Sequence, residues 1–537
     1  MNIKEEISNI LLSSIRKLGI NEGTIILEVP NDKANGDFAS NIAMQLASVL
    51  KKSPKDIASE IVKSIESNNY IEKIEIAGPG FLNFYINKNA LFGIIEDVLN
   101  QKEEYGKSSI GKGKKINVEF ASINPTGVIH LGHARGSAYG DNICRILSFA
   151  GYDVTREYYI NDGGNQINNM GRSVQTRYLN LCGNDIAMPE DGYFGPEVIE
   201  IAKDIYKEYN DKYLTESFEY FRERGLDILL ERIKNDLANF RVTFNVWTSE
   251  RSVREAGRIE ESLKILDKMG KTYKSEEALW LKSTDYGDEK DRVLVKSNGE
   301  YAYITPDIAY HLDKLDRGYD TLIDVFGADH HGYVPRLKAA IEALGYDKNR
   351  LEVKIIQMVR LLRAGEEVKM SKRTGNVITV NDLIEEVGID AARYYFAMRN
   401  IDSQMDFDIE LAVKKSHDNP VYYVSYAHAR ICSLLKNKTI IPTTKFDTID
   451  SEWAYELLTK VNEFKDVVEM SANKRMPHLI TNYVYDLANA FHIYYNHEKI
   501  LTDDEKYSNE RLLLAMSVKI VIKNALNLIG VEAPDEM

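Results

Sequence analysis

Hydrophobic positions in the middle of the chain repeat in a way that predicts a parallel sheet. From residue 116 to about 400, short apolar runs alternate with stretches of helical spacing, and the runs read "INVEF", "DVTREYYI", "TLIDVFG" and "LEVKIIQMV". Strands that alternate with helices in this manner are typical of α/β folds with crossover helices. Because such sheets bind ligands at the carboxyl ends of their strands, chemically active residues are expected there.

In the first hundred residues, apolar positions repeat with the period of a helix in some segments and of a strand in others. The first twenty have the apolar spacing of a helix. Further on, the pattern predicts a strand at 24–29, helix over 40–62 and a pair of strands within 71–86. The pair turns at "GPG", residues 78–80, since glycine and proline favour turns. This region is expected to form a small α+β domain.

Helical spacing continues from residue 417 to the end of the chain. Four stretches, at 419–437, 451–474, 477–496 and 509–530, predict a bundle of four or five helices. At the other boundary, residues 101–115 are rich in Lys, Gly and Ser, as is typical of a linker. We therefore expect three domains: an α+β domain at 1–107, a parallel α/β domain at 108–400 and an all-α domain at 401–537.

Composition indicates the compartment of the protein and excludes some classes of protein. With 537 residues and 44% apolar composition, the chain is long enough to bury several cores. Its three cysteines form no CxxC pair, which favours a reducing compartment, the cytoplasm. The first twenty residues lack the uninterrupted apolar stretch of a signal peptide, and no apolar run reaches the roughly 18 residues of a membrane helix. A net charge of −14 argues against a protein that coats nucleic acid without specificity, although it is compatible with a local basic groove.

A pair of histidines follows the first predicted strand of the sheet. The segment "NPTGVIHLGHARG", residues 124–136, sets His130 and His133 where the strand gives way to a helix. A helix N-terminus offers free backbone N–H groups and a positive dipole end, which suit phosphate, and Gly132 allows a flat ring or a phosphate close to the backbone. Alternatively, the two histidines cap the helix structurally. A zinc site is the weaker interpretation, since zinc sites usually add a cysteine or an acidic ligand nearby.

A basic loop lies further along the chain. In "EEVKMSKRTGN", residues 366–376, the cations Lys369, Lys372 and Arg373 surround "MS" in a polar segment. By itself such a loop is most often a solvated surface. Downstream of an HxGH segment, in a chain with a parallel-sheet pattern, it is much more specific.

Together the two segments resemble the HIGH and KMSKS signatures of class I aminoacyl-tRNA synthetases. The resemblance implies a Rossmann-like catalytic domain in which both signatures hold ATP, accompanied by magnesium, while an amino-acid carboxylate attacks the α-phosphate. Donors fixed in advance around the phosphate stabilise the charge of such a transition state. The residues implied as catalytic are His130, His133, Lys369 and Lys372. The residues implied in ATP binding are Asn124, Pro125, Gly127, His130, Gly132, His133, Lys369, Met370, Ser371 and Lys372.

Nearly the whole chain is similar to arginyl-tRNA synthetases. The stretches that carry the likeness are "VEFASINPTGVIHLGHARG", "YYINDGGNQI", "ALWLKSTDYGDEKDRVLVKSNGEYAYITPDIAYH", "FGADHHGY" and "NPVYYVSYAHARI". They imply that L-arginine and ATP give arginyl-adenylate and pyrophosphate, and that the arginyl group then passes to the 3′-terminal ribose of arginine tRNA. Members of this family commonly need tRNA before they form the adenylate.

A pocket for arginine should be acidic, because a guanidinium is planar, always charged and needs carboxylate partners. Glu119 alternates with apolar neighbours, and Tyr303 and Asp307 are four residues apart, so that they can share a helix face. The likeness implies that these three receive the side chain. The full set of implied arginine contacts is Glu119, Ser122, Asn124, His133, Tyr303, Asp307 and Asp329.

Several of these assignments have alternatives. Glu119 could be a solvated strand residue, and Asp307, which follows a proline, could be a helix cap. Asp329 stands where some family members have Gln, so it could instead face the ribose of ATP or the α-amino group. Residues 162–166, "DGGNQ", could be only a turn, although the likeness puts them beside the active site.

The adjacent His330 and His331 look like a metal pair. Neighbouring residues at the end of a strand point in opposite directions, however, so we expect no structural zinc.

The flanking domains would then contact tRNA. Residues 35–41, "NGDFASN", resemble the family's N-terminal module, which touches the outer corner of the tRNA, and the helical domain of the family reads the anticodon. Bases stack on aromatic side chains, and phosphates pair with cations. The candidates are Tyr422, Tyr426 and Arg430, with Tyr423 and His428 as further possibilities at helical spacing. Some of them must be core residues. No membrane partner is expected, and a monomer is the default expectation.

Two other functions are compatible with parts of this pattern. One is a nucleotidyltransferase with a smaller substrate, which also uses HxGH. The other is a catalytically silent RNA-binding or regulatory protein. The KMSKR loop and the long helical C-terminal region argue against the first, and the intact signatures argue against the second.

Overall fold

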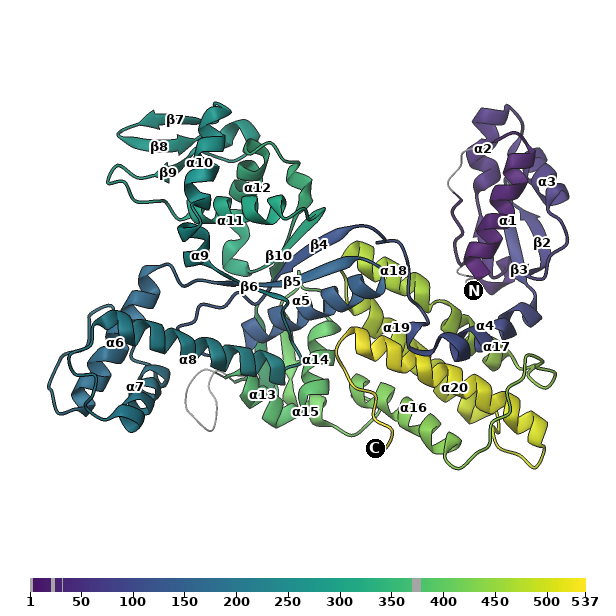
Figure 1. Cartoon of the computed structure of the whole chain (residues 1–537). Coiled ribbons are helices and arrows are strands. Elements are labelled where there is room, and N and C mark those ends of the chain that lie inside the picture. The colour runs from purple at the N-terminus through teal and green to yellow at the C-terminus, as the bar shows by residue number, and fades with distance from the viewer. Residues whose placement is uncertain (1–2, 21–24, 31, 369–377) are drawn as a thin grey trace.

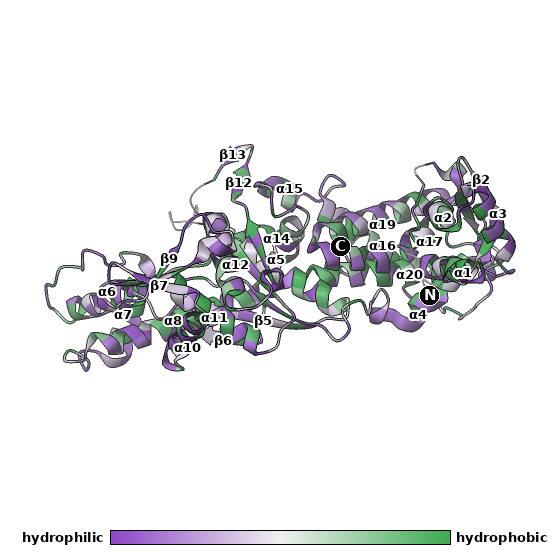
Figure 2. Ribbon diagram, turned by 90° about the horizontal axis from the view of Figure 1, so that it is seen from above, coloured by the Kyte–Doolittle hydropathy of each residue, from purple (hydrophilic) through white to green (hydrophobic). Residues whose placement is uncertain are grey.

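The computed structural model describes residues 3–20, 25–30, 32–368 and 378–537. An α/β region is flanked by an α+β module at the N-terminus and by helices at the C-terminus, as the sequence predicted (Figure 1). Seen from above, the molecule is elongated, with helices α6 (Asn165–Leu181) and α7 (Pro196–Tyr209) at one end and the N-terminal module at the other (Figure 2). None of the helices in the described part of the chain has the length and apolar character needed to cross a membrane.

Five parallel strands form the central sheet, in the order β11-β10-β4-β5-β6. Their bounds are β4 Lys115–Glu119, β5 Asp153–Ile160, β6 Val246–Ser249, β10 Thr321–Gly327 and β11 Leu351–Ile356. The four strands predicted from apolar runs are all present. The sequence pattern missed β6, because this short edge strand buries none of its side chains fully and so lacks an apolar run.

The chain winds away from β4 in both directions. Strands β5 and β6 lie on one side of β4, whereas β10 and β11 lie on the other, so the strand order reverses between β4 and β10. Helix α5 (Leu131–Phe149) follows β4 and packs closely on it, since a Cβ added to Gly140 would lie 2.2 Å from the ring of Phe120. Such a reversal opens a crevice at the carboxyl ends of the strands.

Two insertions extend the α/β region (Figure 1). Between β5 and β6, helices α6, α7 and α8 (Phe218–Asn239) pack around an apolar core of their own. Between β6 and β10, helices pack beside an antiparallel sheet of order β7-β8-β9. The elements of this second insertion are α9 Glu250–Glu255, α10 Arg258–Lys268, β7 Thr272–Ser275, β8 Ala278–Leu281, the 3-10 helix η3 Ser283–Tyr286, β9 Arg292–Val295 and α11 Ile304–Asp316.

Shorter elements complete the region. Around and after β10 and β11 lie η4 Ala328–Tyr333, α12 Val334–Ala343, η5 Lys348–Arg350, β12 Val359–Arg363, β13 Glu366–Glu367, α13 Val380–Val387, α14 Ile389–Ala397, β14 Met405–Asp408 and α15 Ile409–Val413. Strand β12 pairs with β13 and β14 in a small separate sheet.

The N-terminal module is a three-stranded antiparallel sheet, in the order β1-β3-β2, covered by helices. Its elements are α1 Ile3–Lys17, η1 Lys33–Asn35, β1 Phe38–Ser40, α2 Ile42–Leu50, α3 Pro54–Ser64, β2 Ile71–Ala77 and β3 Phe81–Ile86. The helix predicted over 40–62 is two helices, because Ser53 caps a new start at Pro54. The strand predicted at 24–29 was wrong: in its described part only Glu28 pairs, by a single bridge to Ala39.

Helix α4 (Lys88–Gln101) connects the module to the rest of the protein and leads into η2 (Lys102–Glu104). It packs against two helices of the C-terminal bundle, α17 and α20, whose bounds are given below. The division of the chain at residues 107 and 400 remains a prediction.

The C-terminal bundle has five helices in the described chain, in agreement with the prediction of four or five. They are α16 Pro420–Leu435, α17 Glu452–Asn462, α18 Phe464–Lys474, α19 His478–His497 and α20 Glu505–Leu528. Apolar residues gather on the inner faces of these helices (Figure 2).

A buried arginine joins the bundle to helix α5 of the α/β region. Arg393 on α14 donates to Asp141 of α5 (2.5 Å) and to the backbone carbonyls of Ile529 (3.0 Å) and Phe240 (2.9 Å). Arg393 and Asp141 are both fully buried. Helix α5, which begins directly after His130, is therefore tied to the end of the last bundle helix through the Arg393 guanidinium, and Arg145 of α5 adds a hydrogen bond to the carbonyl of Asn527 (3.4 Å).

Candidate active site

A cavity of about 530 Å³ opens at the carboxyl ends of β4 and β10. Its walls come from β4 and the loop that follows it, from α5 and α11, and from η4. Residues predicted from the sequence that line it are Glu119, Ser122, Asn124, His130, Gly132, His133, Tyr303, Asp307 and Asp329. They come from three separate stretches of the chain, at 119–133, 303–307 and 329, and the sheet topology brings them together.

The remaining predicted residues are not on the described wall. Pro125 and Gly127 belong to the loop after β4 but do not line the cavity. The positions Lys369, Met370, Ser371 and Lys372 lie outside the described residues.

His130 is the N-cap of α5. Its Nδ1 accepts hydrogen bonds from the backbone N–H groups of Gly132 (3.2 Å) and His133 (3.4 Å), and the rings of the two histidines stack with centroids 3.6 Å apart. A Cβ on Gly132 would lie 3.2 Å from the His130 ring, so glycine permits this close approach. The capping alternative is therefore realised by His130, whose ring occupies two of the N–H groups that were expected to be free for phosphate.

Both histidines are held in the neutral state at physiological pH. Burial lowers the pKa of His130, and burial together with the charge of His130 lowers the pKa of His133 to about 3. The Nδ1 atom of His133 is buried and has no hydrogen-bond partner in the described part of the chain. Because leaving a buried polar atom unpaired costs free energy, this nitrogen is well placed to meet a polar group of a ligand.

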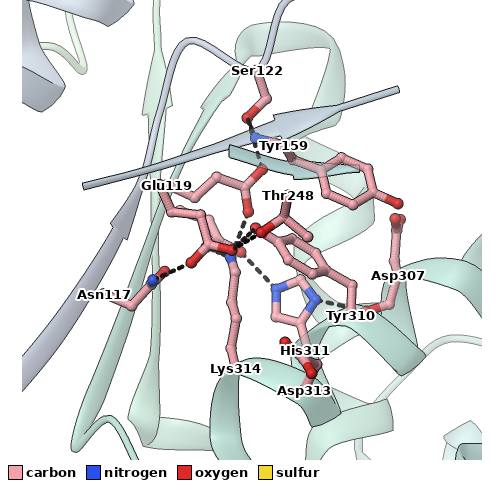
Figure 3. A network of polar contacts seen from close by, with 12 residues as sticks. Asn117, Glu119, Ser122, Tyr159, Thr248, Asp307, Tyr310, His311, Asp313 and Lys314 are labelled. Atoms are coloured by element: carbon pink, nitrogen blue, oxygen red, sulfur yellow. Dashed lines mark hydrogen bonds and ion pairs between the residues drawn. The ribbon is translucent and has the colours of Figure 1, made fainter. Parts of the chain in front are cut away.

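Glu119, the last residue of β4, is only 6% exposed, so the alternative of a solvated strand residue was wrong. Its carboxylate accepts hydrogen bonds from Ser122 Oγ (3.0 Å) and Lys314 Nζ (2.5 Å). Ser122 Oγ in turn accepts from the backbone N–H of Tyr159 (3.1 Å). Burial raises the pKa of Glu119 against the opposing charge of Lys314. Glu119 thus lines the cavity as part of a polar network (Figure 3).

Asp307 lies in the first turn of α11 and does not cap this helix, so the capping alternative was wrong. Its Oδ2 accepts a hydrogen bond from the phenol hydroxyl of Tyr333, and none of the described cations forms an ion pair with it. Burial raises the pKa of Asp307 to about 6, although Tyr333 and His311 oppose this. Tyr303, four residues earlier, has an exposed side chain on the same cavity. A partly desolvated carboxylate without a cation is a good partner for a cationic ligand.

The loop after β5 reaches the cavity through Asn161, whose Nδ2 donates to Asn124 Oδ1 (2.8 Å). The next residue, Asp162, instead accepts hydrogen bonds from Ser249 Oγ (2.7 Å) and the backbone N–H of Arg251 (3.0 Å). The "DGGNQ" segment therefore borders the site without lining it.

Asp329 and His330 line the cavity from η4, with Oδ2 and Nε2 3.4 Å apart. The sequence argument placed His330 and His331 at a strand end, which was wrong, because the chain enters a 3-10 helix directly after Gly327. Only His330 of the pair is on the cavity wall.

The sequence patterns did not single out several residues of the site. Those that line the cavity are Tyr159, Tyr310, His311, Tyr333, Gln357 and Met358, and Lys314 lies behind Glu119. His311 and Lys314 follow Asp307 at spacings of four and seven, so the periodicity of α11 could have pointed to them. Gln357 and Met358 follow β11 and carry no local signal.

Comparison with known proteins identifies the family. Residues 94–431 match the family model described as tRNA synthetases class I (R), catalytic domain, which covers more than half of the chain. The arginyl tRNA synthetase N terminal domain matches residues 1–86, and the DALR anticodon binding domain matches residues 424–537. The chain belongs to the arginyl-tRNA synthetase family.

Individual members of the arginyl-tRNA synthetase family agree over nearly the full length. The chain is 54% identical to arginine–tRNA ligase 1 of Halalkalibacterium halodurans, over 96% of this chain and 94% of the relative. It is 52% identical to arginine–tRNA ligase of Bacillus subtilis, over the whole of both. Among solved structures, a putative arginyl-tRNA synthetase from Campylobacter jejuni has a TM-score of 0.79 and 35% identity, covering 84% of this chain and 100% of that one. The fold is also shared with the Thermus thermophilus arginyl-tRNA synthetase, with a TM-score of 0.77 at 20% identity over 99% of this chain and 100% of that one.

Helix α16, most of which falls within the match to the anticodon-binding domain at residues 424–537, carries an aromatic surface. The rings of Tyr422 and Tyr426 are nearly parallel, 6.0 Å apart, and the Arg430 guanidinium lies 4.5 Å from the ring centroids of Tyr426 and Tyr495. All of these side chains are partly accessible. His428, in contrast, is 1% exposed and donates from Nδ1 to the carbonyl of Pro534. The suggestion that His428 contacts RNA was therefore wrong.

His428 also belongs to a group of possible metal ligands with Cys432 and Asp535. The thiol of Cys432 already donates to Asp535 (3.1 Å), and the ammonium of Lys519 lies 3.9 Å from the same carboxylate. A nearby cation disfavours a metal ion. The absence of structural zinc remains a prediction.

Proposed function

We propose that this protein is an ATP-dependent ligase that activates L-arginine to arginyl-adenylate, releases pyrophosphate and transfers the arginyl group to the 3′-terminal ribose of arginine tRNA. Membership of the arginyl-tRNA synthetase family and the close likeness to arginine–tRNA ligases support it. The observation that carries the proposal is one cavity that holds both the HxGH helix and Asp307, a carboxylate without a described cationic partner.

The amino acid is assigned to the acidic side of the cavity. Asp307, Tyr303 and Glu119 receive the guanidinium, because a planar cation needs carboxylate and hydroxyl acceptors. The other end of the amino acid meets Ser122, Asn124 and His133. The exposed carboxylate of Asp329 is assigned to the α-amino group or to the ribose of ATP.

ATP, with the magnesium ion that accompanies it as substrate, is assigned to the N-terminus of α5. His130 and His133 are neutral there, so each ring keeps one N–H that can donate to a phosphate oxygen without the repulsion between two adjacent imidazolium ions. Lys369 and Lys372, which lie outside the described residues, are assigned to the pyrophosphate, where their charges stabilise the charge that develops in the transition state. The remaining ATP contacts in the proposal are Asn124, Pro125, Gly127, Gly132, Met370 and Ser371.

The tRNA is assigned to the two flanking domains, with Tyr422, Tyr426 and Arg430 on the side of the anticodon. The parallel tyrosine rings and the guanidinium beside them support stacking on unpaired bases. A cytoplasmic monomer completes the proposal, in keeping with three cysteines that are all free.

The decisive measurement is exchange of labelled pyrophosphate into ATP, assayed with each amino acid, with and without tRNA. Exchange is expected with arginine alone among the amino acids, and to depend on arginine tRNA, since tRNA bound at both flanking domains can favour a closed site. Exchange with a different amino acid would overturn the assignment. Full-speed exchange without tRNA would remove only the coupling to tRNA.

The acidity of the pocket leads to an expected pH profile. A carboxyl with a pKa of about 6 is about 90% ionised at pH 7 and about 10% ionised at pH 5. Because arginine should bind the ionised form of Asp307, kcat/KM for arginine in the full reaction should fall about tenfold between pH 7 and pH 5. A profile that stays flat down to pH 5 would contradict the role of Asp307.

A further inference from the structure

Three carboxylates stand in a row across the central sheet, on neighbouring parallel strands. Glu119 of β4 is the register partner of Glu157 on β5 and of Asp324 on β10. Glu157 and Asp324 are fully buried and Glu119 is 6% exposed. Like charges that are this close and withdrawn from water destabilise each other unless cations offset them. The fold must therefore place cations against this row.

Helix α11 and its C-terminal end provide the opposing groups from one face, namely the cations Lys314 and Arg317 and the imidazole of His311. His311 Nε2 lies 2.7 Å from Asp324 Oδ2, and Arg317, just after the helix, donates to Glu157 (2.9 Å). The same face begins at Asp307 on the cavity wall, seven residues before Lys314 (Figure 3). One helix face thus runs from the cavity to the acidic row.

Lys314 occupies the centre of this arrangement. Its side chain has no exposed surface, and its Nζ donates to both Glu119 Oε2 (2.5 Å) and Asp324 Oδ1 (3.0 Å). Its ammonium lies 4.4 Å from the centroid of the Tyr310 ring. Lys314 does not line the cavity, whereas Glu119 does. Any effect of Lys314 on a ligand must therefore pass through its neighbours.

We propose that Lys314 is a positioning residue for arginine binding, which holds the carboxylate of Glu119 ionised and directed toward the cavity. The role rests on the proposed function, in which Glu119 receives the guanidinium. Without the ammonium, Glu119 would be a buried carboxylate beside two others, and it would take up a proton and lose its attraction for arginine.

The electrostatic surroundings of Glu119 support this role. The groups that face it are Lys314, His311, Tyr310 and Asp307 from α11, Asp324 from β10, and Glu157 and Tyr159 from β5. Burial raises the pKa of Glu119, and Lys314 is the strongest opposing influence. For Lys314 itself, burial favours the neutral amine, but Asp324 and Glu119 outweigh burial and raise its pKa, so it stays charged.

The test uses the full chain with arginine tRNA and compares Lys314→Met with Lys296→Met, which removes an exposed ammonium paired with Glu300 in the same region. In pyrophosphate exchange, Lys314→Met should raise the KM for arginine about tenfold or more at pH 6.5, relative to the unmodified protein, with the KM for ATP changed by less than about threefold. The ratio of the KM for arginine in Lys314→Met to that in the unmodified protein should shrink as the pH rises to 8.5, because Glu119 loses its proton again in the variant. A ratio independent of pH, or an equal loss for both substrates, would overturn the proposal.

A double-mutant cycle separates positioning from a structural role. In a Glu119→Gln background, Lys314→Met should add less than about threefold to the KM for arginine, since the carboxylate through which it acts is absent. If the factors by which Lys314→Met and Glu119→Gln each raise the KM for arginine simply multiplied in the double variant, the proposal would be contradicted.

If Lys314→Met does not fold, the variant with both Lys314→Met and Asp324→Asn removes one charge of each sign and should still show the raised, pH-dependent KM. If the KM for arginine of that variant equalled that of the unmodified protein, the positioning role of Lys314 would be overturned. An unmodified protein without any arginine-dependent exchange would instead remove the proposed function itself.

Discussion

Replacement of Asp307 by Asn is expected to raise the KM for arginine by about 30-fold or more, while the protein keeps its fold. Asn has the size of Asp and can still accept the hydrogen bond from Tyr333, but it carries no charge. Truncating one side of a desolvated charge pair costs about 2 to 5 kcal/mol, and about 1.4 kcal/mol corresponds to a factor of ten. The measurement is the KM for arginine in aminoacylation at pH 8, where Asp307 is ionised.

Two comparisons sharpen this experiment. Asp329→Asn removes a carboxylate that is 80% exposed on the same cavity and should change the KM much less, because water screens an exposed charge. Citrulline, which has the shape of arginine without the charge, should compete poorly with arginine in the unmodified protein and less poorly in Asp307→Asn. An unchanged KM for arginine in Asp307→Asn would show that the guanidinium binds elsewhere.

Replacement of Asp141 by Asn should destabilise the protein by about 3 to 5 kcal/mol, the usual cost of breaking a buried ion pair from one side. Asp141 is fully buried on α5 and pairs with Arg393 (2.5 Å), Arg145 (2.7 Å) and Arg156 (2.5 Å). Burial alone would raise its pKa, but the three guanidinium groups outweigh burial and lower it. The variant would leave three clustered cations without their common anion.

The loss should appear as a lower free energy of unfolding in urea, followed by circular dichroism. Asp406→Asn provides the control, since its pair with Arg360 is bidentate but exposed and should contribute less than about 1 kcal/mol. Equal losses in the two variants would mean that burial of the cluster around Asp141 does not matter.

These expectations depend to different degrees on local sequence. The position of His130 and His133 could be predicted, because a strand-to-helix junction with a glycine is a local feature, and the structure shows this junction. That His130 uses its own ring to cap the helix could not be predicted, since it depends on the side-chain conformation. The acidity of the pocket was expected as well. The sequence did not indicate that Glu119 is paired with a lysine whereas Asp307 has no described cationic partner.

The clearest case is Glu119. Its alternation with apolar neighbours was consistent with a strand, and the strand is present. Its partner Lys314 is 195 residues away, and no periodicity within either segment connects them. Tyr333, which donates to Asp307 from 26 residues away, escaped notice for the same reason.

The sequence by itself determined four strands of the central sheet and the helical bundle, because the period of apolar residues reports which side of an element is buried. It also determined the family and the two signature segments. It did not determine β6, where this period is short, or the break between α2 and α3, where the period is continuous across the boundary. The tertiary structure alone decided that β10 lies beside β4, which aligns Glu119, Glu157 and Asp324 and lays α11 against them. The physical reason is that burial acts on each residue separately and leaves a local pattern, whereas charge compensation depends on which distant elements pack together.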